Sequence, residues 1–357
     1  MHYDDVDQTN LPARTADRLL QLKDAMVLEG IPARGPDTTL IATWNIREFD
    51  SNAYGARSLE CLYYIAEICS KFDIIAIQEV REKLDALNAI CRIMGHGWRY
   101  IVSDVSEGTP GNRERMAFLY DSSKVHFTGL AGEIVVPPIA VKENGKTVRY
   151  DPARQLYRTP FIVGFQSGWT VLQLCTVHIL YGKDEADNEE RAREIAAVAK
   201  FLAKRADEGQ IGDANLVLLG DFNIYKPGDI TMKAITDAGF VIPPELQDDP
   251  ATTTGKKKRH YDQIAVMPQM WRMETTGRAG VFDFFNTVYR DADQAAYIGE
   301  MGDAYNVTSK GNVRSESGKT TYFRTYWRTH QMSDHLPMWI EIRSDYSREY
   351  LEEFVPA

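Results

Sequence analysis

Leu216-Val217-Leu218-Leu219-Gly220-Asp221-Phe222-Asn223 is an apolar run that ends in a compact polar group. A short apolar run of this kind is typical of a buried β-strand. Polar residues stand at the end or the start of five further apolar runs: Asn45, Glu79, His178, Asp262 and Ser333-Asp334-His335. Functional groups gather at the edge of a sheet where its strands stop. We therefore expect these side chains to lie together.

Each of these residues alone has an ordinary structural explanation. Asn45 can be a turn residue, Glu79 a carboxylate at a helix start and Asp221 a helix N-cap. His178 can be a core histidine. Six such sites on six apolar runs, drawing on Asn, Asp, Glu and His, are hard to explain by capping. The recurrence favours a shared functional site.

From Thr39 onward, short apolar runs alternate with amphipathic helical patterns. Strands are expected at residues 40–44, 74–77, 116–120, 171–177, 216–219 and 264–266, and alternation over 336–342 predicts a half-buried strand. Helices are expected at 59–68, 84–94 and about 184–208. Consecutive strands between Trp98 and His178 favour mixed sheets with helices outside, in a single large α/β domain.

The composition is that of a soluble globular protein, with 44% hydrophobic and 26% charged residues among 357. No apolar stretch approaches the roughly 18 residues that cross a bilayer. The acidic N-terminus does not resemble a secretory signal. Four cysteines do not make a disulfide framework, so Cys61, Cys69 and Cys175 are expected to be buried thiols. We expect a cytoplasmic protein without membrane association.

The net charge of −10 argues against a protein that coats nucleic acid through bulk attraction. It is compatible with an enzyme that meets a polyanion at one local patch. Two segments are basic: the run Lys256 to His260, and the stretch Lys310 to His330, whose basic residues are interleaved with aromatic ones. A solvated loop is the ordinary explanation of either segment taken alone.

The polar inventory points to one class of chemistry. Asp, Glu and Asn without cysteine describe a hard-oxygen site for Mg²⁺ or Mn²⁺ and not a structural zinc site. Two histidines, each with a carboxylate to fix its tautomer, suit proton transfer near neutral pH. The sequence has no Walker-type phosphate loop, Gly-x-Ser-x-Gly elbow or dinucleotide fingerprint. Metal-assisted phosphoester hydrolysis is the reaction class that is left.

Five short motifs resemble those of the endonuclease/exonuclease/phosphatase superfamily and occur in its order over about Thr39 to Arg343: Thr43-Trp44-Asn45-Ile46, Ile77-Gln78-Glu79-Val80, Gly220-Asp221-Phe222-Asn223, Tyr261-Asp262-Gln263-Ile264 and Ser333-Asp334-His335. One motif alone is weak, whereas five in sequence are specific. The resemblance implies a four-layer αββα sandwich of two mixed β-sheets flanked by helices. It also implies divalent-metal-dependent cleavage of phosphodiesters or phosphomonoesters at the sheet ends.

The deoxyribonuclease I branch is the most similar. Residues 113–120 resemble its segment with a histidine-orienting glutamate, which implies that role for Glu114. Arg158-Thr159-Pro160-Phe161 resembles its phosphate-contacting arginine segment, and Val177-His178 its first catalytic histidine. A surface ion pair is the ordinary alternative for Glu114 and Arg158. The secretion and disulfides of the vertebrate members have no counterpart in this chain.

The resemblance implies the following roles. Glu79 and Asp334, with help from Asn45, hold one Mg²⁺ or Mn²⁺. Asn45, Asn223 and Arg158 stabilise the charge of the transition state. Asp221 orients or deprotonates the attacking water, while Asp262 holds His335 and Glu114 holds His178. Which histidine acts as base and which as acid is left open.

The resemblance also sets the expected boundaries. Residues 1–37 are an N-terminal extension with one amphipathic helix, 38–345 the catalytic domain and 346–357 a C-terminal tail. The domain contains a basic, aromatic insertion at about 305–330. Because this insertion precedes Ser333, bases are expected to stack on Tyr322, Tyr326 or Trp327 while arginines such as Arg328 meet phosphates.

DNA cut internally is the expected substrate, with no membrane and no obligate protein partner. One alternative is a phosphatase or phosphodiesterase acting on inositol phosphates or phospholipid head groups, which Lys256 to Arg259 would grip. An abasic-site repair endonuclease is a second alternative, and a catalytically silent binding module is a third. DNA versus RNA, internal versus terminal cleavage, the number of metals and the oligomeric state stay open.

Overall fold

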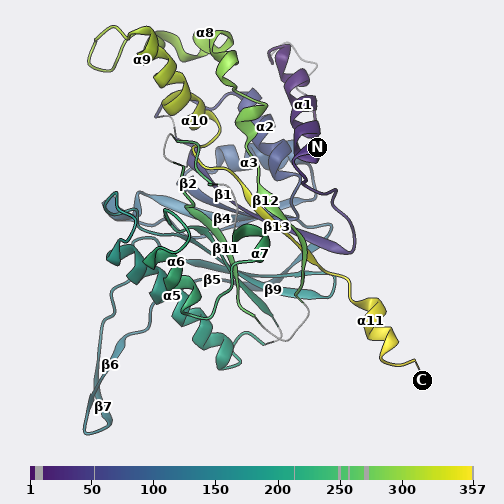
Figure 1. The fold of residues 1–357 in the computed structure, drawn as a ribbon, viewed down its shortest axis with the longest axis vertical. Helices are drawn as coiled ribbons and strands as arrows, with labels where there is room; N and C mark the ends of the chain where they lie inside the picture. Colours follow the sequence, from purple (N-terminus) through teal and green to yellow (C-terminus); the bar gives the residue numbers. More distant parts are fainter. Residues whose placement is uncertain are drawn as a thin grey trace.

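Two β-sheets lie face to face between layers of helices in the computed structural model of the chain (Figure 1). The structure describes residues 1–4, 11–51, 53–212, 214–247, 251–255, 258–268 and 273–355. The predicted α/β sandwich of two mixed sheets flanked by helices is confirmed.

The first sheet has six strands in the order β12-β13-β1-β2-β4-β3. Their bounds in that order are Thr275–Val281, Met338–Arg343, Thr38–Phe49, Ile74–Arg81, Glu114–Asp121 and Trp98–Val102. β1 and β2 are parallel, whereas β13 and β4 run antiparallel to them. The carboxyl ends of β1 and β2 therefore meet the amino end of β4 at one edge.

The second sheet has five strands in the order β11-β10-β9-β8-β5. Their bounds in that order are Asp262–Val266, Asn215–Asp221, Thr170–His178, Phe161–Ser167 and Val125–Glu133. β9 and β10 are parallel, and β11 is antiparallel to β10. A separate hairpin, β6 (Ile139–Glu143) and β7 (Lys146–Asp151), projects from the body (Figure 1).

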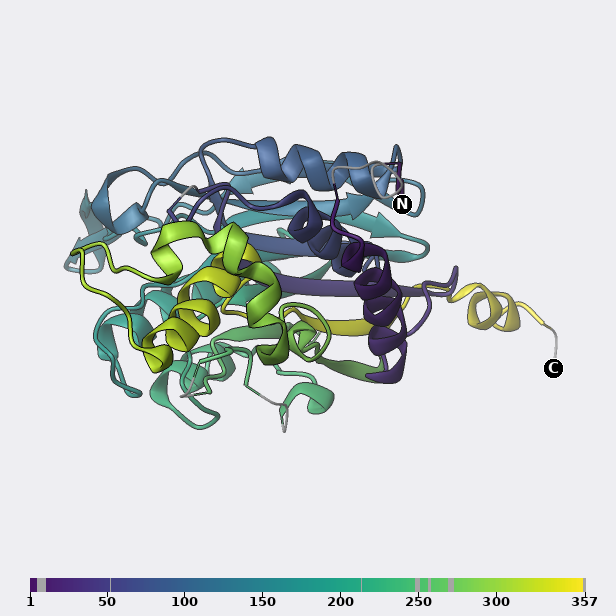
Figure 2. The same cartoon turned by 90° about the horizontal axis from the view of Figure 1, so that it is seen from above.

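Helices cover the outer faces of both sheets. The first sheet is covered by α1 (Arg14–Leu28), α2 (Leu59–Cys69) and α3 (Asp85–Met94), and the second by α5 (Glu189–Asp207) and α6 (Ile230–Thr236). Shorter helices are α4 (Gly108–Gly111), α7 (Pro244–Gln247) and α11 (Ser347–Glu352). Figure 2 shows α11 extending away from the body near the C-terminus.

A group of short helical segments between β12 and β13, residues 284–331, forms what we call the cap. Its segments are η1 (Phe284–Asn286), η2 (Asp291–Tyr297), α8 (Ile298–Met301), η3 (Gly302–Tyr305), α9 (Glu316–Thr321), η4 (Tyr322–Trp327) and α10 (Arg328–Gln331). The segments from α8 to α10 lie at the top of Figure 1, beyond one end of the sheets.

Each face of the first sheet has its own core. On β1, Leu40, Ala42 and Trp44 pack with the helices, while Ile41 packs between the sheets. Successive side chains on a strand point to opposite faces, so a strand buried on both faces is apolar throughout. This explains why β1 and β2 appear in the sequence as continuous apolar runs.

The structure contains every predicted strand and helix, with two corrections. The last strand, β13, is buried on both faces and not half-buried, because Glu341 has no exposed surface and pairs with Arg278 at 2.6 Å. The helix expected from about residue 184 begins at Glu189, where the Asn188 side chain caps it by accepting from the Arg191 amide at 2.8 Å.

The N-terminal helix α1 belongs to the packed core. Its Leu19, Leu22 and Met26 are buried, and Arg14 forms an ion pair with the buried Glu60 of α2 at 2.7 Å. The predicted buried thiols Cys61, Cys69 and Cys175 are free and buried. Within the described part of the chain, no helix has the length and apolarity that crossing a bilayer requires.

Candidate active site

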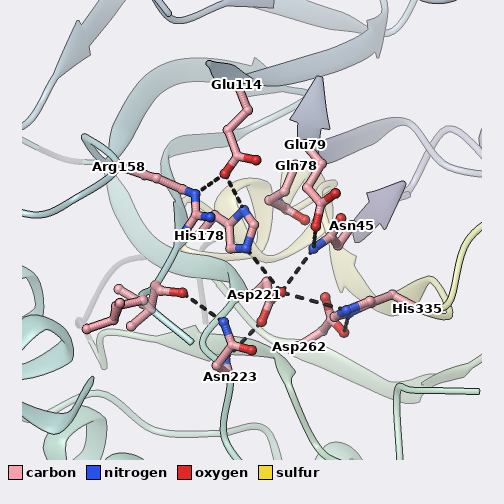
Figure 3. Close-up of polar contacts among 12 residues, drawn as sticks. Asn45, Gln78, Glu79, Glu114, Arg158, His178, Asp221, Asn223, Asp262 and His335 are labelled. Atoms are coloured by element: carbon pink, nitrogen blue, oxygen red, sulfur yellow. Dashed lines mark hydrogen bonds and ion pairs between the residues drawn. The ribbon is translucent and has the colours of Figure 1, made fainter. Parts of the chain in front are cut away.

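The polar residues at the strand ends meet at one edge of the sandwich (Figure 3). In the second sheet, the strand register places His178 of β9 beside Asp221 of β10 and Asp262 of β11 on its other side. In the first sheet, Asn45 and Glu79 stand near the carboxyl ends of β1 and β2. Parallel strands deliver their carboxyl ends to the same edge, and the antiparallel neighbours contribute residues from their amino ends.

Asp221 lies at the centre of this group and is 2% exposed. Its Oδ2 accepts a hydrogen bond from Asn45 Nδ2 at 3.0 Å. The same oxygen lies 3.6 Å from Nε2 of His178 and 3.8 Å from Nε2 of His335. Its Oδ1 accepts from the Asn223 backbone amide at 2.8 Å. One carboxylate therefore faces both imidazoles and joins groups from the two sheets.

The residue before Asp221 has to be glycine. Gly220 has a φ of +133°, and a Cβ built on it would lie 2.1 Å from the carbonyl oxygen of Val177. A side chain there would clash with the backbone of the neighbouring strand. The close approach of β9 and β10 at this point keeps His178 and Asp221 side by side.

His178 is held by a buried carboxylate. Its Nδ1 lies 2.8 Å from Oε1 of Glu114, and the Arg158 guanidinium contacts the same oxygen. Burial alone would favour the neutral acid, but the charges of His178 and Arg158 lower the pKa of Glu114 to about 2. Burial and Arg158 disfavour the imidazolium, yet Glu114 and Asp221 raise the pKa of His178 above its ordinary value.

His335 has an equivalent partner in the second sheet. Its Nδ1 lies 2.8 Å from Oδ2 of the fully buried Asp262. Burial opposes the charged imidazole, but Asp262 and Asp221 together raise the pKa of His335 well above its ordinary value. Burial also raises the pKa of Asp262. Each imidazole thus has a carboxylate behind it and Asp221 in front.

Two residues near this cluster hold the backbone in place. The Asn223 side chain donates from Nδ2 to the carbonyl oxygen of Ile179 at 2.7 Å, which ties the loop after β10 to the end of β9. Ser333 Oγ donates to the Asn45 carbonyl at 2.6 Å and accepts from the His335 amide at 3.0 Å. Ser333 therefore ties the His335 segment to β1.

Asn45 and Glu79 lie in contact and offer oxygen atoms of the kind that a hard cation takes, and Asp334 is a further carboxylate whose charge acts on Glu79. Asn45 Nδ2 donates to Glu79 Oε1 at 3.1 Å, and the Asn45 Oδ1 atom is buried without a hydrogen-bond partner. Burial raises the pKa of Glu79, and the nearby carboxylates of Glu114 and Asp334 add to this increase. A divalent cation would give Asn45 Oδ1 a partner and would favour the charged form of Glu79, so these residues fit a divalent cation.

Clusters of three or more His, Cys, Asp or Glu residues with a metal-binding arrangement do not occur in the described ranges. A donor set of Asn45, Glu79 and Asp334 contains no Cys or His, so it differs from that of a zinc site. Magnesium commonly takes only one or two protein carboxylates and keeps several waters. Two carboxylates and one amide oxygen are consistent with this ligand preference of magnesium.

A cavity of about 700 Å³, which we call the cap cleft, opens beside His335. Asp334 and His335 line it, and so do five residues of the cap: Thr321, Arg324, Thr325, Arg328 and Thr329. The predicted basic, aromatic insertion therefore borders the cluster around Asp221, although it is helical and not a loop.

The aromatic side chains of the insertion differ from the prediction. Tyr322 and Trp327 are 5% and 2% exposed, so they are core residues and cannot stack on bases. Tyr326 is 42% exposed but packs against Tyr54, at 6.2 Å between ring centroids, on a helix face that does not line the cap cleft. Local sequence could not show that Trp327 packs against Tyr297.

Arg328 lines the cap cleft but is already engaged. Its Nη1 donates to the Tyr289 carbonyl at 3.0 Å and to Asp291 at 2.9 Å, and the side chain is 13% exposed. Within the basic run Lys256 to His260, Lys256 and Lys257 lie outside the described residues. Arg259 is described and also lines the cap cleft.

One residue beneath the site had no predicted role. Gln78 is fully buried, and its Nε2 donates to Thr176 Oγ1 of the other sheet at 2.8 Å and to Thr43 Oγ1 at 3.1 Å. It links the two sheets directly below Glu79 (Figure 3). The signal available in the sequence is an amide side chain that directly follows the apolar run 74–77.

Comparison with known proteins identifies relatives of the chain. The Endonuclease/Exonuclease/phosphatase family model matches residues 42–240. No match is found among curated proteins. The fold is similar to that of the human nocturnin catalytic domain with bound sulfate (14% identity, TM-score 0.51, covering 87% of this chain and 96% of that one).

Two further solved structures have a similar fold. One is an endonuclease/exonuclease/phosphatase family protein from Bacteroides thetaiotaomicron (14% identity, TM-score 0.50, covering 88% of this chain and 100% of that one). The other is D. rerio TDP2 complexed with single strand DNA product (14% identity, TM-score 0.50, covering 85% and 98%). At these identities the similarity establishes the fold.

Proposed function

The chain belongs to the endonuclease/exonuclease/phosphatase family, whose members hydrolyse phosphoester bonds, and from this premise we propose that it is a divalent-metal-dependent phosphodiesterase that cleaves DNA. The observation that carries the proposal is the position of Asp221. Its Oδ2 lies 3.6 Å and 3.8 Å from the two imidazoles, and each imidazole has its own buried carboxylate. This is an arrangement for proton transfer on both sides of one reacting group.

In the proposed reaction, the oxygen of a water molecule attacks phosphorus and the P–O bond to the leaving group breaks. Asp221 orients the water and accepts its proton directly or through one imidazole. The other imidazole donates a proton to the leaving oxygen. Glu114 and Asp262 fix the orientation of His178 and His335, because each carboxylate lies 2.8 Å from an Nδ1 atom.

The transition state carries additional negative charge on the phosphoryl oxygens. Asn223 contributes an amide group and Arg158 a guanidinium next to Glu114, whereas Asn45, whose Nδ2 already donates to Asp221 and Glu79, would act through the cation. Fixed donors of this kind stabilise developing charge without reorganisation. Glu79 and Asp334, with Asn45, would hold Mg²⁺ or Mn²⁺. When bound, the ion supplies Lewis-acid polarisation of a phosphoryl oxygen.

A nucleic-acid substrate is supported by three features. The cap cleft combines arginine and tyrosine side chains beside His335, which suits phosphates and bases. A protein of similar fold, D. rerio TDP2, is described in complex with a single strand DNA product. The segments with Glu114 and Arg158 also resemble those of the deoxyribonuclease I branch.

The direct test is a substrate panel with metal omission. The purified protein is incubated with supercoiled plasmid, linear duplex, single-stranded and abasic DNA, RNA and soluble inositol phosphates, with Mg²⁺ or with EDTA. We expect DNA cleavage that requires the metal. Turnover of inositol phosphates without cleavage of nucleic acid would contradict the proposal, and so would DNA cleavage at an equal rate in EDTA.

A further inference from the structure

The cap cleft is a shaped binding site next to the catalytic group. Its volume of about 700 Å³ lies within the range of roughly 300–1,000 Å³ that is typical of pockets for small ligands. Asp334 and His335 border it, so a substrate held there places a phosphate beside the catalytic residues. A volume of this size suits one part of a substrate and not a length of duplex.

The cap contributes one face of its helix to this cleft. Thr321, Thr325 and Thr329 stand four residues apart, and Arg324 and Arg328 repeat the same spacing beside them. The hydroxyls of Thr321 and Thr329 already donate to the carbonyl oxygens of Ser317 at 2.9 Å and Thr325 at 2.7 Å, so the guanidinium groups are the donors that this face offers to phosphate oxygens. The cap residues that line the cleft are therefore polar and basic.

The two arginines of this face differ in availability. Arg324 pairs with Asp291 at 2.8 Å, and the two side chains are 48% and 53% exposed. An ion pair this exposed contributes little, so a substrate phosphate can replace Asp291 as the partner of Arg324. Arg328 is 13% exposed and its guanidinium lies 4.3 Å from the Phe285 ring centroid, so it holds the cap together.

Two tyrosines, Tyr181 and Tyr261, also line the cleft. Tyr261 lies 5.8 Å from His335 between ring centroids, and Tyr181 lies 6.2 Å from Tyr261 in an edge-to-face arrangement. Tyr181 is 42% exposed, so part of its surface is open to a ligand. An aromatic side chain near a catalytic histidine offers a surface on which a base can stack.

The loop that carries Tyr181 is held in place by contacts within the protein. Arg191 is fully buried and donates to the carbonyl oxygens of Leu180 at 3.4 Å and Glu185 at 3.1 Å. Its guanidinium also contacts the carbonyl of Tyr181 and lies 4.9 Å from the Tyr225 ring centroid. Because these contacts fix the loop, little conformational entropy would be lost when a ligand binds against Tyr181.

We propose that the cap cleft binds one unpaired nucleotide next to the scissile phosphate, with its base against Tyr181 and a flanking phosphate on Arg324. This inference rests on the proposed phosphodiesterase function and specifies its substrate as single-stranded nucleic acid or an unpaired end. A base inside a duplex is stacked on its neighbours and would have to be unpaired, at a cost of a few kcal/mol, before reaching Tyr181.

The charges in the cleft argue against a multiply phosphorylated head group. Its arginines Arg259, Arg324 and Arg328 face the carboxylates of Asp184, Asp291 and Asp334. Arg259 already lies 4.1 Å from the Tyr225 ring centroid and 3.9 Å from Asp184. Among the lining residues that the structure describes, these charges are balanced, which accommodates one additional phosphate and leaves no cluster of free cations for several.

The test compares three substrates in Mg²⁺: a labelled single-stranded oligonucleotide, the same sequence as a blunt duplex, and bis(4-nitrophenyl) phosphate, which has no nucleoside. The variants are Tyr181→Ala, Tyr181→Phe and Arg324→Ala. Arg193→Ala, on an exposed arginine of α5, is the matched control. Thermal unfolding of each variant verifies that it is folded.

For the wild type, we expect kcat/KM to be at least about tenfold higher on the single strand than on the duplex. The readout for the variants is the ratio of kcat/KM on the single strand to that on bis(4-nitrophenyl) phosphate. We expect this ratio to fall about 5- to 100-fold in Tyr181→Ala and Arg324→Ala, as for the loss of one stacked base or phosphate contact. Tyr181→Phe keeps the ring and should stay near the wild type.

Two results would overturn the inference while leaving the phosphodiesterase proposal intact. One is a wild type that cleaves the duplex as fast as the single strand. The other is a ratio that does not change in Tyr181→Ala and Arg324→Ala. If the wild type hydrolyses none of the three substrates, the proposed function fails and the inference fails with it.

Discussion

The two ends of the β-sandwich bury carboxylates in opposite ways. At the end far from the site, Asp73 precedes β2 and has no exposed surface. It pairs with Arg34 and Lys124, each at 2.6 Å, and accepts from the Leu40 amide at 2.8 Å. At the catalytic end, Asp221 is 2% exposed, and its polar neighbours are the Asn45 amide, a backbone N–H and two imidazoles.

In the proposed mechanism, this difference is the one between a structural charge and a reactive one. A buried carboxylate paired with two cations is satisfied by the protein itself. The end with Asp221 instead leaves the buried Asn45 Oδ1 atom without a hydrogen-bond partner. A buried polar atom without a partner is expected where a ligand from outside the protein binds. The comparison predicts that substitutions at one end affect the rate and substitutions at the other affect stability.

The largest expected effect is at His335. Replacement by alanine removes a proton-transfer group, so we expect kcat to fall about 10²- to 10⁴-fold with Mg²⁺ on plasmid DNA. The unfolding temperature should also fall, because the buried Asp262 loses the partner of its Oδ2, so kcat is compared at a temperature at which both proteins are folded. The matched control is His126→Ala, which changes an exposed histidine of β5. A His335→Ala enzyme with near wild-type kcat would contradict the prediction that substitutions at this end of the sandwich lower the rate.

A smaller effect is expected at Glu114. Glu114→Gln keeps the shape but removes the charge behind His178, and a hydrogen bond to a charged group contributes about 1.5–3 kcal/mol. We therefore expect kcat/KM to fall about 10- to 100-fold. Glu143→Gln, on the exposed β6 strand, is the control. If both variants matched the wild type, Glu114 would be a structural residue like Asp73.

The smallest expected effect concerns stability and pH at His330. This histidine is buried, its Nε2 lies 3.2 Å from the Gly55 carbonyl, and burial with Arg57 lowers its pKa to about 4. Arg47 acts in the same direction, whereas Glu48 opposes it. The pKa of His330 in the folded chain lies below the value of about 6.5 in the unfolded chain, so the fold favours the neutral ring. The stability that this preference provides is fully present above about pH 6.5 and is lost as the pH falls toward the folded pKa.

As the pH falls from 7 to 5, the unfolded chain takes up a proton at this position and the folded chain does not. We expect the free energy of unfolding to drop by about 1–2 kcal/mol more in the wild type than in His330→Gln. Urea unfolding at both pH values measures this difference. Equal drops in the two proteins would show that His330 is not the group that titrates.

The strands and the site residues at their ends could be predicted from sequence. An apolar run followed by Asn45 or Asp221 is a local pattern, and buried parallel strands must deliver their ends to one edge. Partners across the sheets could not be predicted in the same way. Gln78 bonds to Thr176, 98 positions away, and nothing local shows this.

The cap shows the same limit. Arginines and aromatic residues alternate over 322–328, a composition typical of a nucleic-acid contact. In the structure, Trp327 and Tyr322 are core residues, and Thr321 and Arg324 line the cleft instead. Which face of a short helix is buried depends on the elements packed against it, here η1 and η2, and a single sequence does not contain that information.

The most direct test applies the same change, Asp to Asn, at the two ends of the sandwich. Rate constants on plasmid DNA with saturating Mg²⁺ and urea unfolding are measured for Asp221→Asn and Asp73→Asn. We expect Asp221→Asn to lose about 10²- to 10⁴-fold in rate at unchanged stability. Asp73→Asn should lose about 3 kcal/mol of stability, because Lys124 loses its carboxylate partner and Arg34 keeps only Asp121, while the folded enzyme keeps its rate. An Asp221→Asn enzyme that cleaves at the wild-type rate would contradict the account.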